Sequence, residues 1–202
     1  MAFSSTSFIQ QENARLKADN ESLQAEVRAL REFVRILNDL AESSSKFRSD
    51  SELLPLLNDI LKKALNLLNA PDGSLLLLDE EQAELVFVIV HGAIAGDLSG
   101  FRIPANQGIA GWVIQNASSC LVRDVKRDAR FSHMVDEEFK FRTQSIAAAP
   151  IIGDGKVYGL IEALNQPGDE PFSENDLALL RLLCRAAGEA LGDIERMHPA
   201  EA

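Results

Sequence analysis

The chain has 202 residues, of which 46% are hydrophobic and 25% are charged, and its formal net charge is −11. This length suits one domain with an extension, or two small domains, and the hydrophobic fraction allows a packed core. The acidic balance is the opposite of the clustered Lys and Arg that bind nucleic acid, so we expect no nucleic-acid partner.

The start of the chain lacks the basic and apolar regions of a secretory signal. An uncharged stretch over residues 103–122 approaches the length of a membrane span. It contains Pro104, Gly108 and several amide side chains, so we expect no membrane partner. Cys120 and Cys184 have no metal-binding spacing, which fits reduced thiols in a cytoplasmic protein.

Residues 1–9 are expected to be disordered, and residues 10–41 are expected to form a parallel coiled coil. Leucines recur there every seven residues; placing them at heptad position d puts asparagine or valine at position a. Charged pairs such as Glu12 with Lys17 would link two parallel helices. A single amphipathic helix is the alternative, but the apolar stripe is narrow for a helix that faces a core. The predicted homodimer contact comprises Leu16, Leu23, Leu30, Leu37, Asn13, Asn20, Val27 and Val34.

A polar joint over residues 42–50 follows the heptads, and a folded domain is expected over residues 51–196, before a disordered tail over residues 197–202. Ser49 and Glu52 have the spacing of a capping box, which predicts the start of a helix. The leucine-rich run after them ends at a Pro-Asp-Gly turn.

Short apolar runs, typical of strands, begin after this turn. SLLLL and ELVFVIV flank an acidic turn and predict an antiparallel pair, and FRIP and CLVRDV add shorter strands. SIAAAPII and KVYGLIEAL flank Asp154-Gly155, a two-residue hairpin signal. Ser173 and Asp176 form another capping box, which predicts a terminal helix from Ser173 to about Arg196.

The strand runs are apolar on both faces, so their mainly antiparallel sheet must be covered by helices on both sides. We expect the helix from Ser51 and the terminal helix on one side. A short helix over residues 108–117 and an irregular segment over residues 128–141 would cover the other side. The fold class is therefore α+β with three layers. The second covering is weakly patterned, which indicates a loose lid over a small-molecule cavity.

The order of these segments resembles a GAF domain, a small-molecule-binding and regulatory module, over roughly residues 50 to 195. GAF domains that bind cyclic nucleotides often carry Asn-Lys, a spacer, Phe, three residues and Asp-Glu. Asn165, Phe172 and Asp176 match that motif, whereas Gln166 and Leu177 replace its lysine and glutamate. In the family the lysine pairs with the aspartate and supports the pocket. Gln166 cannot form this ion pair, which weighs against cyclic nucleotide binding.

Seven residues are candidates for contact with a ligand, most of them on the lid over residues 123–141: Trp112, Arg123, Asp124, Phe131, His133, Phe139 and Glu162. Trp112 and Phe131 fit a core role as well as a cavity lining. His133 fits a structural or exposed role as well as a haem ligand. Glu162 fits a carboxylate at a sheet edge or one satisfied by a neighbour, or a polar group inside the pocket.

No Ser-His-Asp spacing, phosphate loop or HExxH motif is visible, so we expect no enzymatic activity. The leading interpretation is a dimeric sensory module that binds a small ligand and signals through its flanking helices to an unknown downstream protein. A GAF-like scaffold without a ligand and a haem-based gas sensor using His133 are the alternatives. The ligand is open: a nucleotide or another small molecule, with haem disfavoured and no metal site expected.

Overall fold

The computed structural model describes residues 8–21, 24, 53–168 and 171–197. Residues 8–21 form a helix, which includes two positions expected to be disordered. Apart from Gln24, the remainder of the predicted coiled coil lies outside the described residues, as do the joint and the Ser49–Glu52 capping pair. The N-terminal helix belongs to a unit over residues 1–39, distinct from the unit that contains the folded domain.

The folded domain contains the strands and the three longer helices expected from the sequence, in the expected order, together with short helices that were not expected. Its elements are α2 (Leu53–Leu67), β1 (Asp72–Asp79), β2 (Glu84–His91), α3 (Ala95–Leu98), β3 (Arg102–Pro104), α4 (Gly108–Asn116), β4 (Cys120–Val122), a 3-10 helix (Val125–Arg127), α5 (Met134–Phe139), β5 (Ile146–Gly153), β6 (Lys156–Leu164) and α6 (Glu174–Met197). The six-residue α5 lies in the segment expected to be irregular, and it has no buried residue that would have marked it as a helix.

The six strands form one antiparallel sheet in the order β3-β2-β1-β6-β5-β4. Both predicted hairpins are confirmed, and Asp154 and Gly155 take the positive φ angles, 50° and 78°, that a tight two-residue turn requires. The last strand in the chain lies in the middle of the sheet, beside the first. This crossover makes residues of β1 and β6 that are far apart in sequence direct neighbours.

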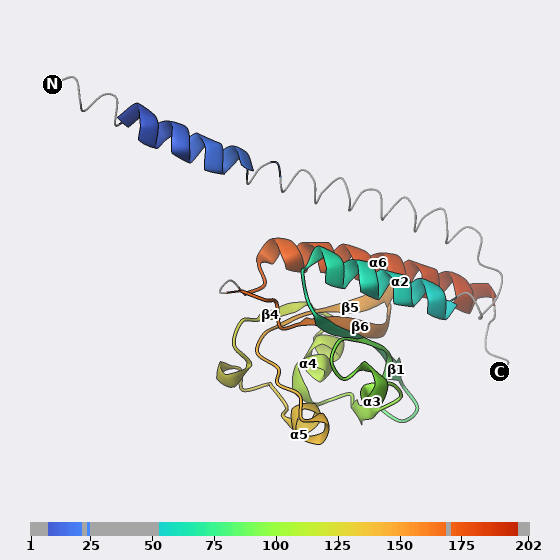
Figure 1. The fold of residues 1–202 in the computed structure, drawn as a ribbon. Coiled ribbons are helices and arrows are strands. Elements are labelled where there is room, and N and C mark those ends of the chain that lie inside the picture. Colours follow the sequence, from blue (N-terminus) through green and yellow to red (C-terminus); the bar gives the residue numbers. More distant parts are fainter. Residues whose placement is uncertain (1–7, 22–23, 25–52, 169–170, 198–202) are drawn as a thin grey trace. The chain divides into compact units, whose positions relative to one another are not determined.

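The sheet is covered on both faces, as its two-sided apolar strands predict (Figure 1). Helices α2 and α6 lie together on one face, and α3, α4 and α5 lie on the other. Side chains alternate along β6, so that Leu160 and Glu162 face the α4 side while Ile161 and Ala163 face α2 and α6. The three-layer α+β fold is therefore confirmed.

Helix α6 approaches the sheet at backbone contact distance. A Cβ added to Gly153 of β5 would overlap the backbone of Gly188 of α6, and one added to Gly188 would overlap the carbonyl of Ile152. Near the end of α6, Glu195 accepts hydrogen bonds from Lys156 Nζ at 2.9 Å and from the Tyr158 hydroxyl at 2.6 Å. These contacts join the second half of α6 to the β5–β6 hairpin.

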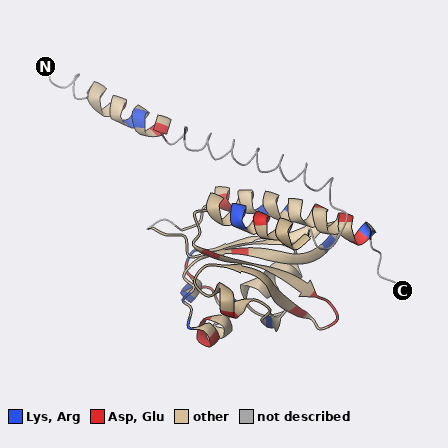
Figure 2. Cartoon of the chain, turned by 45° about the vertical axis from the view of Figure 1, so that its right-hand side comes forward, with Lys and Arg blue, Asp and Glu red and all other residues tan. Residues whose placement is uncertain are grey.

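Among the described helices, none combines the length and apolarity needed to cross a bilayer. Acidic and basic positions are interspersed over the helices and turns of the folded domain (Figure 2). The strands contribute few charges, which leaves Glu162 as a carboxylate in an otherwise apolar part of the sheet.

Candidate functional site

A cavity of about 90 Å³ lies between the sheet and the layer formed by α3, α4 and α5. Its volume is several times the roughly 10–15 Å³ that one water requires. Most of its wall is apolar, from Phe87, Val90, Ile94, Leu98, Ile103, Ile109, Ala110, Phe131, Met134, Val135, Phe141, Ile146 and Leu164. The polar residues of the lining are Asp72, Ser74, His91, Gln107, Ser132, Thr143 and Glu162.

Three of these polar side chains are engaged in structural hydrogen bonds. Asp72 Oδ1 accepts from the backbone N–H of Ala93 at 2.8 Å. His91 Nε2 lies 2.8 Å from Asn58 Oδ1, and burial lowers the pKa of the imidazole, so the ring is neutral at pH 7. Thr143 donates its hydroxyl to Asp136 Oδ1 at 2.7 Å. These three side chains therefore already have hydrogen-bond partners within the protein.

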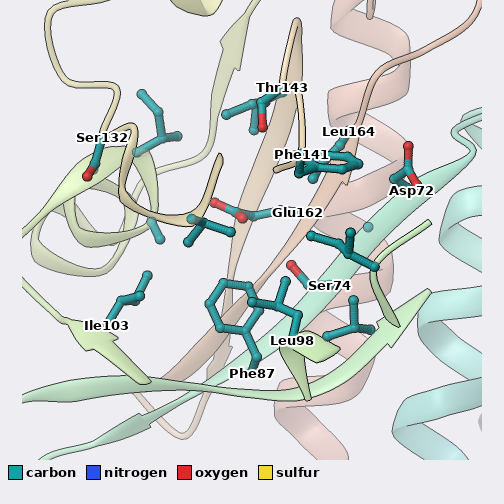
Figure 3. Close-up of a pocket in the computed structure, with 18 of the residues that line it drawn as sticks. Asp72, Ser74, Phe87, Leu98, Ile103, Ser132, Phe141, Thr143, Glu162 and Leu164 are labelled. Carbon is teal, nitrogen blue, oxygen red and sulfur yellow. The ribbon is translucent and has the colours of Figure 1, made fainter. Parts of the chain in front are cut away.

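Of the other four, Ser132 Oγ accepts from the N–H of Met134 at 3.5 Å, and Gln107 makes no side-chain capping bond. Ser74 and Glu162 lie on the floor of the cavity (Figure 3). They are paired across β1 and β6, so their side chains emerge next to each other on the same face. The Ser74 hydroxyl is buried, with no hydrogen-bond partner among the described residues. Burial raises the pKa of Glu162 from 4.5 to about 7, and no described cation or hydrogen-bond donor lowers it again.

The same cross-strand row continues through Ala148 to Cys120 on β4. Burial raises the pKa of the Cys120 thiol to about 11, and the nearby Arg130 opposes that rise. Arg130 is held by Asp128 Oδ2 at 2.6 Å and lies over the Trp112 ring at 4.5 Å from its centroid. An ion pair and an aromatic ring therefore lie near the β4 end of this row, although none of these three side chains lines the cavity.

The structure divides the seven candidate residues into two groups. Phe131 and Glu162 line the cavity, and the other five do not. Arg123 and Asp124 are exposed, and Asp124 caps the 3-10 helix by accepting from the N–H of Lys126. His133 is exposed with its ring 4.9 Å from that of Phe131, and Phe139 packs edge-on against Phe101 at 5.0 Å.

Several cavity residues were not identified from the sequence: Ser74, Phe87, Leu98, Phe141 and Thr143 line the wall as well. Ser74 had a usable signal, because it is a polar residue at the start of an apolar strand run, as Glu162 is within β6. Thr143 and Leu98 had no such signal, since Thr143 lies in the irregular segment before β5 and Leu98 at the end of the four-residue α3.

The residues of the motif make structural contacts and do not line the cavity. Asn165, at φ 58°, accepts from the N–H of Gln144 at 2.7 Å and donates to the Arg142 carbonyl at 3.0 Å. Phe172 is buried in the core. Asp176 and Ser173 form the predicted capping box, with bonds of 2.7 and 3.2 Å.

The two departures from the motif have their own contacts. Gln166 donates its side-chain N–H to the carbonyl of Leu68 at 3.1 Å, which ties the loop after β6 to the end of α2. Leu177 is buried at 3% exposure. The replaced positions therefore support packing in place of an ion pair.

The two cysteines are separated by the sheet. Cys184 on α6 donates to the carbonyl of Ala149 at 3.4 Å, and burial raises the pKa of its thiol strongly. Both thiols are buried and protonated at neutral pH, which makes them poor nucleophiles. No group of three His, Cys, Asp or Glu residues in the described part of the chain is placed to hold a metal ion.

Comparisons with known proteins agree with this architecture. The family model described as GAF domain matches residues 52–191. A dual 3′,5′-cyclic-AMP and -GMP phosphodiesterase 11A from Takifugu rubripes is 28% identical over 96 residues, which cover 46% of this chain and 11% of that protein. Matched segments cover between 8% and 25% of the curated relatives, so the similarity concerns a small part of each.

Two solved structures illustrate the shared fold. The GAF domain of a phosphoenolpyruvate-protein phosphotransferase from Coxiella burnetii has a TM-score of 0.69 at 18% identity, covering 84% of this chain and 97% of that one. A free methionine-R-sulfoxide reductase from Neisseria meningitidis, solved with its substrate, has a TM-score of 0.66 at 17% identity, covering 82% and 91%. At these identities the likeness concerns the fold alone.

Proposed function

Because this chain belongs to the GAF domain family, a family of regulatory and sensory modules, we propose that it is a sensor that binds a small organic ligand in the cavity above β1 and β6. The observation that carries this proposal is the pair Ser74 and Glu162 on the floor of an apolar cavity: a buried hydroxyl without a partner among the described residues, and a carboxyl group whose pKa is raised by burial. Such groups cost stability unless something bonds to them, and a ligand would supply the missing partner.

The proposed route of signalling runs through the thickness of one strand. Glu162 faces the cavity, while its neighbours Ile161 and Ala163 on β6 face the helices on the opposite side. Helix α6 contacts the hairpin through Gly153 and Gly188 without intervening side chains. A ligand that shifts β6 would therefore also move α6. The free energy by which it can shift the equilibrium between two states is at most the difference in its binding free energy for those states.

The proposed assembly is a homodimer joined by the predicted coiled coil and signalling to a separate partner protein. On the N-terminal helix, Ile9 and Leu16 are seven residues apart and are 58% and 56% exposed in the single chain. Exposed apolar residues at this spacing are typical of a helix that pairs with a second copy. Asn13 and Asn20, at the adjacent heptad position, would fix the register.

Catalysis and haem binding are not part of this proposal. Both cysteines have raised thiol pKa values, which disfavours thiol chemistry. His133 is exposed and does not line the cavity, so the residues present do not fit a haem ligated there by this histidine.

A scaffold that binds no small molecule is the second candidate function. The replaced motif positions favour it, because Gln166 and Leu177 serve packing and no longer provide the ion pair and acid of cyclic-nucleotide-binding relatives. A scaffold would dimerise and dock partners with an empty or water-filled cavity.

Mass spectrometry of the protein purified from cells, under native conditions and after denaturation, separates the two candidates. A sensor is expected to release a small molecule, or to gain thermal stability with a member of a metabolite panel. Cyclic AMP and cyclic GMP belong in that panel because of the curated relatives. If no small molecule is released and no metabolite raises the thermal stability, the scaffold is favoured.

A further inference from the structure

The cavity has an unusual distribution of charge for a ligand site. Among the described residues that line it, Asp72 and Glu162 are acidic, His91 is neutral at pH 7, and none is Lys or Arg. Asp72 already accepts from the N–H of Ala93, so its charge is partly satisfied. Glu162 therefore supplies the negative charge of the cavity floor, with the Ser74 hydroxyl beside it, and Gln107 adds a neutral amide at the start of α4.

Within the proposed ligand-binding function, on which this inference rests, we propose that the ligand carries a positively charged nitrogen, an ammonium or a protonated heterocycle, on a small apolar body. That nitrogen donates hydrogen bonds to the carboxylate of Glu162 and the hydroxyl oxygen of Ser74. These residues are neighbours across β1 and β6, so one nitrogen with two or three N–H groups can reach both.

One feature of the cavity favours the opposite charge. The first turn of α4, including Gly108, Ile109 and Ala110, contributes to the wall, and the N-cap residue Gln107 makes no side-chain capping bond. A helix N-terminus carries about half an elementary positive charge, whereas an ionised carboxylate carries a full negative one. The carboxylate dominates near the floor, and the α4 end would suit a neutral acceptor at the far side of the ligand.

A bound cation would also hold Glu162 in its ionised form. The titratable groups around Glu162 are Asp72 and His91 on the cavity wall and Cys120 in the same cross-strand row, with the Arg130–Asp128 pair beyond Cys120. The thiol is protonated and the Arg130–Asp128 pair is internally neutralised, so Glu162 has no competing cation on the cavity floor. The ligand's nitrogen would be its counter-ion.

Three matched fragments test the charge preference: 4-fluorobenzylamine, 4-fluorobenzamide and 4-fluorobenzoate, titrated against the full chain at pH 7.5 by fluorine NMR. The amine is expected to bind at least about tenfold more tightly than the benzoate, a difference of about 1.4 kcal/mol, because the Glu162 carboxylate attracts the ammonium and repels the benzoate. Between pH 6 and pH 8 the affinity for the amine should rise about tenfold, because Glu162 ionises in this range.

Two variants localise the effect. Glu162→Gln should remove the preference for the amine and its pH dependence while leaving the benzamide within about threefold, because the amide keeps the shape and loses the charge. Ser74→Ala should lower the affinity for the amine several-fold. This variant provides the test if circular dichroism shows that Glu162→Gln is poorly folded. Glu81→Gln, in the exposed β1–β2 turn, is the matched control and should change nothing.

The outcomes distinguish the charge of the ligand from ligand binding itself. Equal or tighter binding of the benzoate, or a preference for the amine that survives in both cavity variants, would overturn the assignment of a cationic ligand while leaving a ligand-binding sensor intact. Failure of all three fragments to bind would contradict ligand binding in this cavity and the inference with it.

Discussion

Ser74 of β1 and Glu162 of β6 are direct partners in an antiparallel register, although 88 positions separate them in the sequence. The Ser74 hydroxyl has no partner among the described residues, and burial alone sets the raised pKa of Glu162. A domain that carried these residues only for stability would gain by replacing them with apolar ones. Because burying these polar groups lowers the stability of the domain, this pair is the best place to test function.

The stability of the ligand-free domain should fall as pH rises through the range in which Glu162 ionises. Its folded pKa is about 7 against 4.5 unfolded, so the native state binds more protons between these values, and each rise in pH favours unfolding. The difference amounts to roughly 3 kcal/mol when complete. Urea denaturation of Glu162→Gln at pH 5 and pH 8 should lack this loss. An equal pH dependence in the variant would show that another group causes it.

Replacing Ser74 with alanine should stabilise the ligand-free protein. The buried hydroxyl has no hydrogen-bond partner, and such a group costs about 1–3 kcal/mol. The expected gain in the free energy of unfolding is about 1 kcal/mol, measured by urea denaturation. Ser118→Ala is the matched control with the opposite sign, because the Ser118 hydroxyl donates to the Asn116 carbonyl at 2.8 Å. A loss of stability in Ser74→Ala would mean that the hydroxyl is satisfied in solution.

The contact between α6 and the sheet should tolerate no side chain at Gly188. An added Cβ would overlap the carbonyl of Ile152, so Gly188→Ala must displace the helix from β5. We expect a loss of at least about 2 kcal/mol in the free energy of unfolding, in the range of overpacked cores. Gly96→Ala, where a Cβ would meet open space, is the control and should be neutral. An equally small effect at both sites would refute the close approach.

Asn165 should be needed to order the segment that leads into β5. Asn165→Ala loses the hydrogen bonds to Gln144 and Arg142 and places a Cβ-bearing residue without local side-chain bonds at a positive φ. Amide hydrogen exchange over residues 142–145 should accelerate about tenfold or more, equivalent to roughly 1.4 kcal/mol. Asn165→Gly tolerates the positive φ, so it should show the part of the acceleration that is due to the lost side-chain hydrogen bonds. Unchanged protection in both variants would argue against this tie.

The heptad leucines should control the oligomeric state. Leu16→Glu combined with Leu23→Glu places charges at two d positions and should convert a dimer into a monomer by light scattering. Ala18→Glu combined with Ala25→Glu adds the same charges at outward heptad positions and should leave the dimer intact. A dimer that persists in the leucine variant would mean that the folded domain supplies the dominant interface.

The sequence determined the strands and helices α2, α4 and α6 of the folded domain because their signals are local, whereas α3 and α5 had no such signal. Runs of apolar residues, the Asp154-Gly155 turn and the Ser173–Asp176 capping box specified strands, a hairpin and a helix start, and apolarity on both strand faces required the three layers. Glu162 could also be chosen as a candidate from the sequence, because a single carboxylate within an apolar strand needs an explanation.

Only the tertiary structure decided what surrounds Glu162. Its partner Ser74 depends on the pairing of the first and last strands, which no local pattern specifies. The lid segment is set by long-range packing, so Phe131 reached the cavity while Phe139 turned to Phe101 and His133 to solvent. Local chemistry fixes which element forms, but non-local pairing across the sheet fixes which side chains share a cavity.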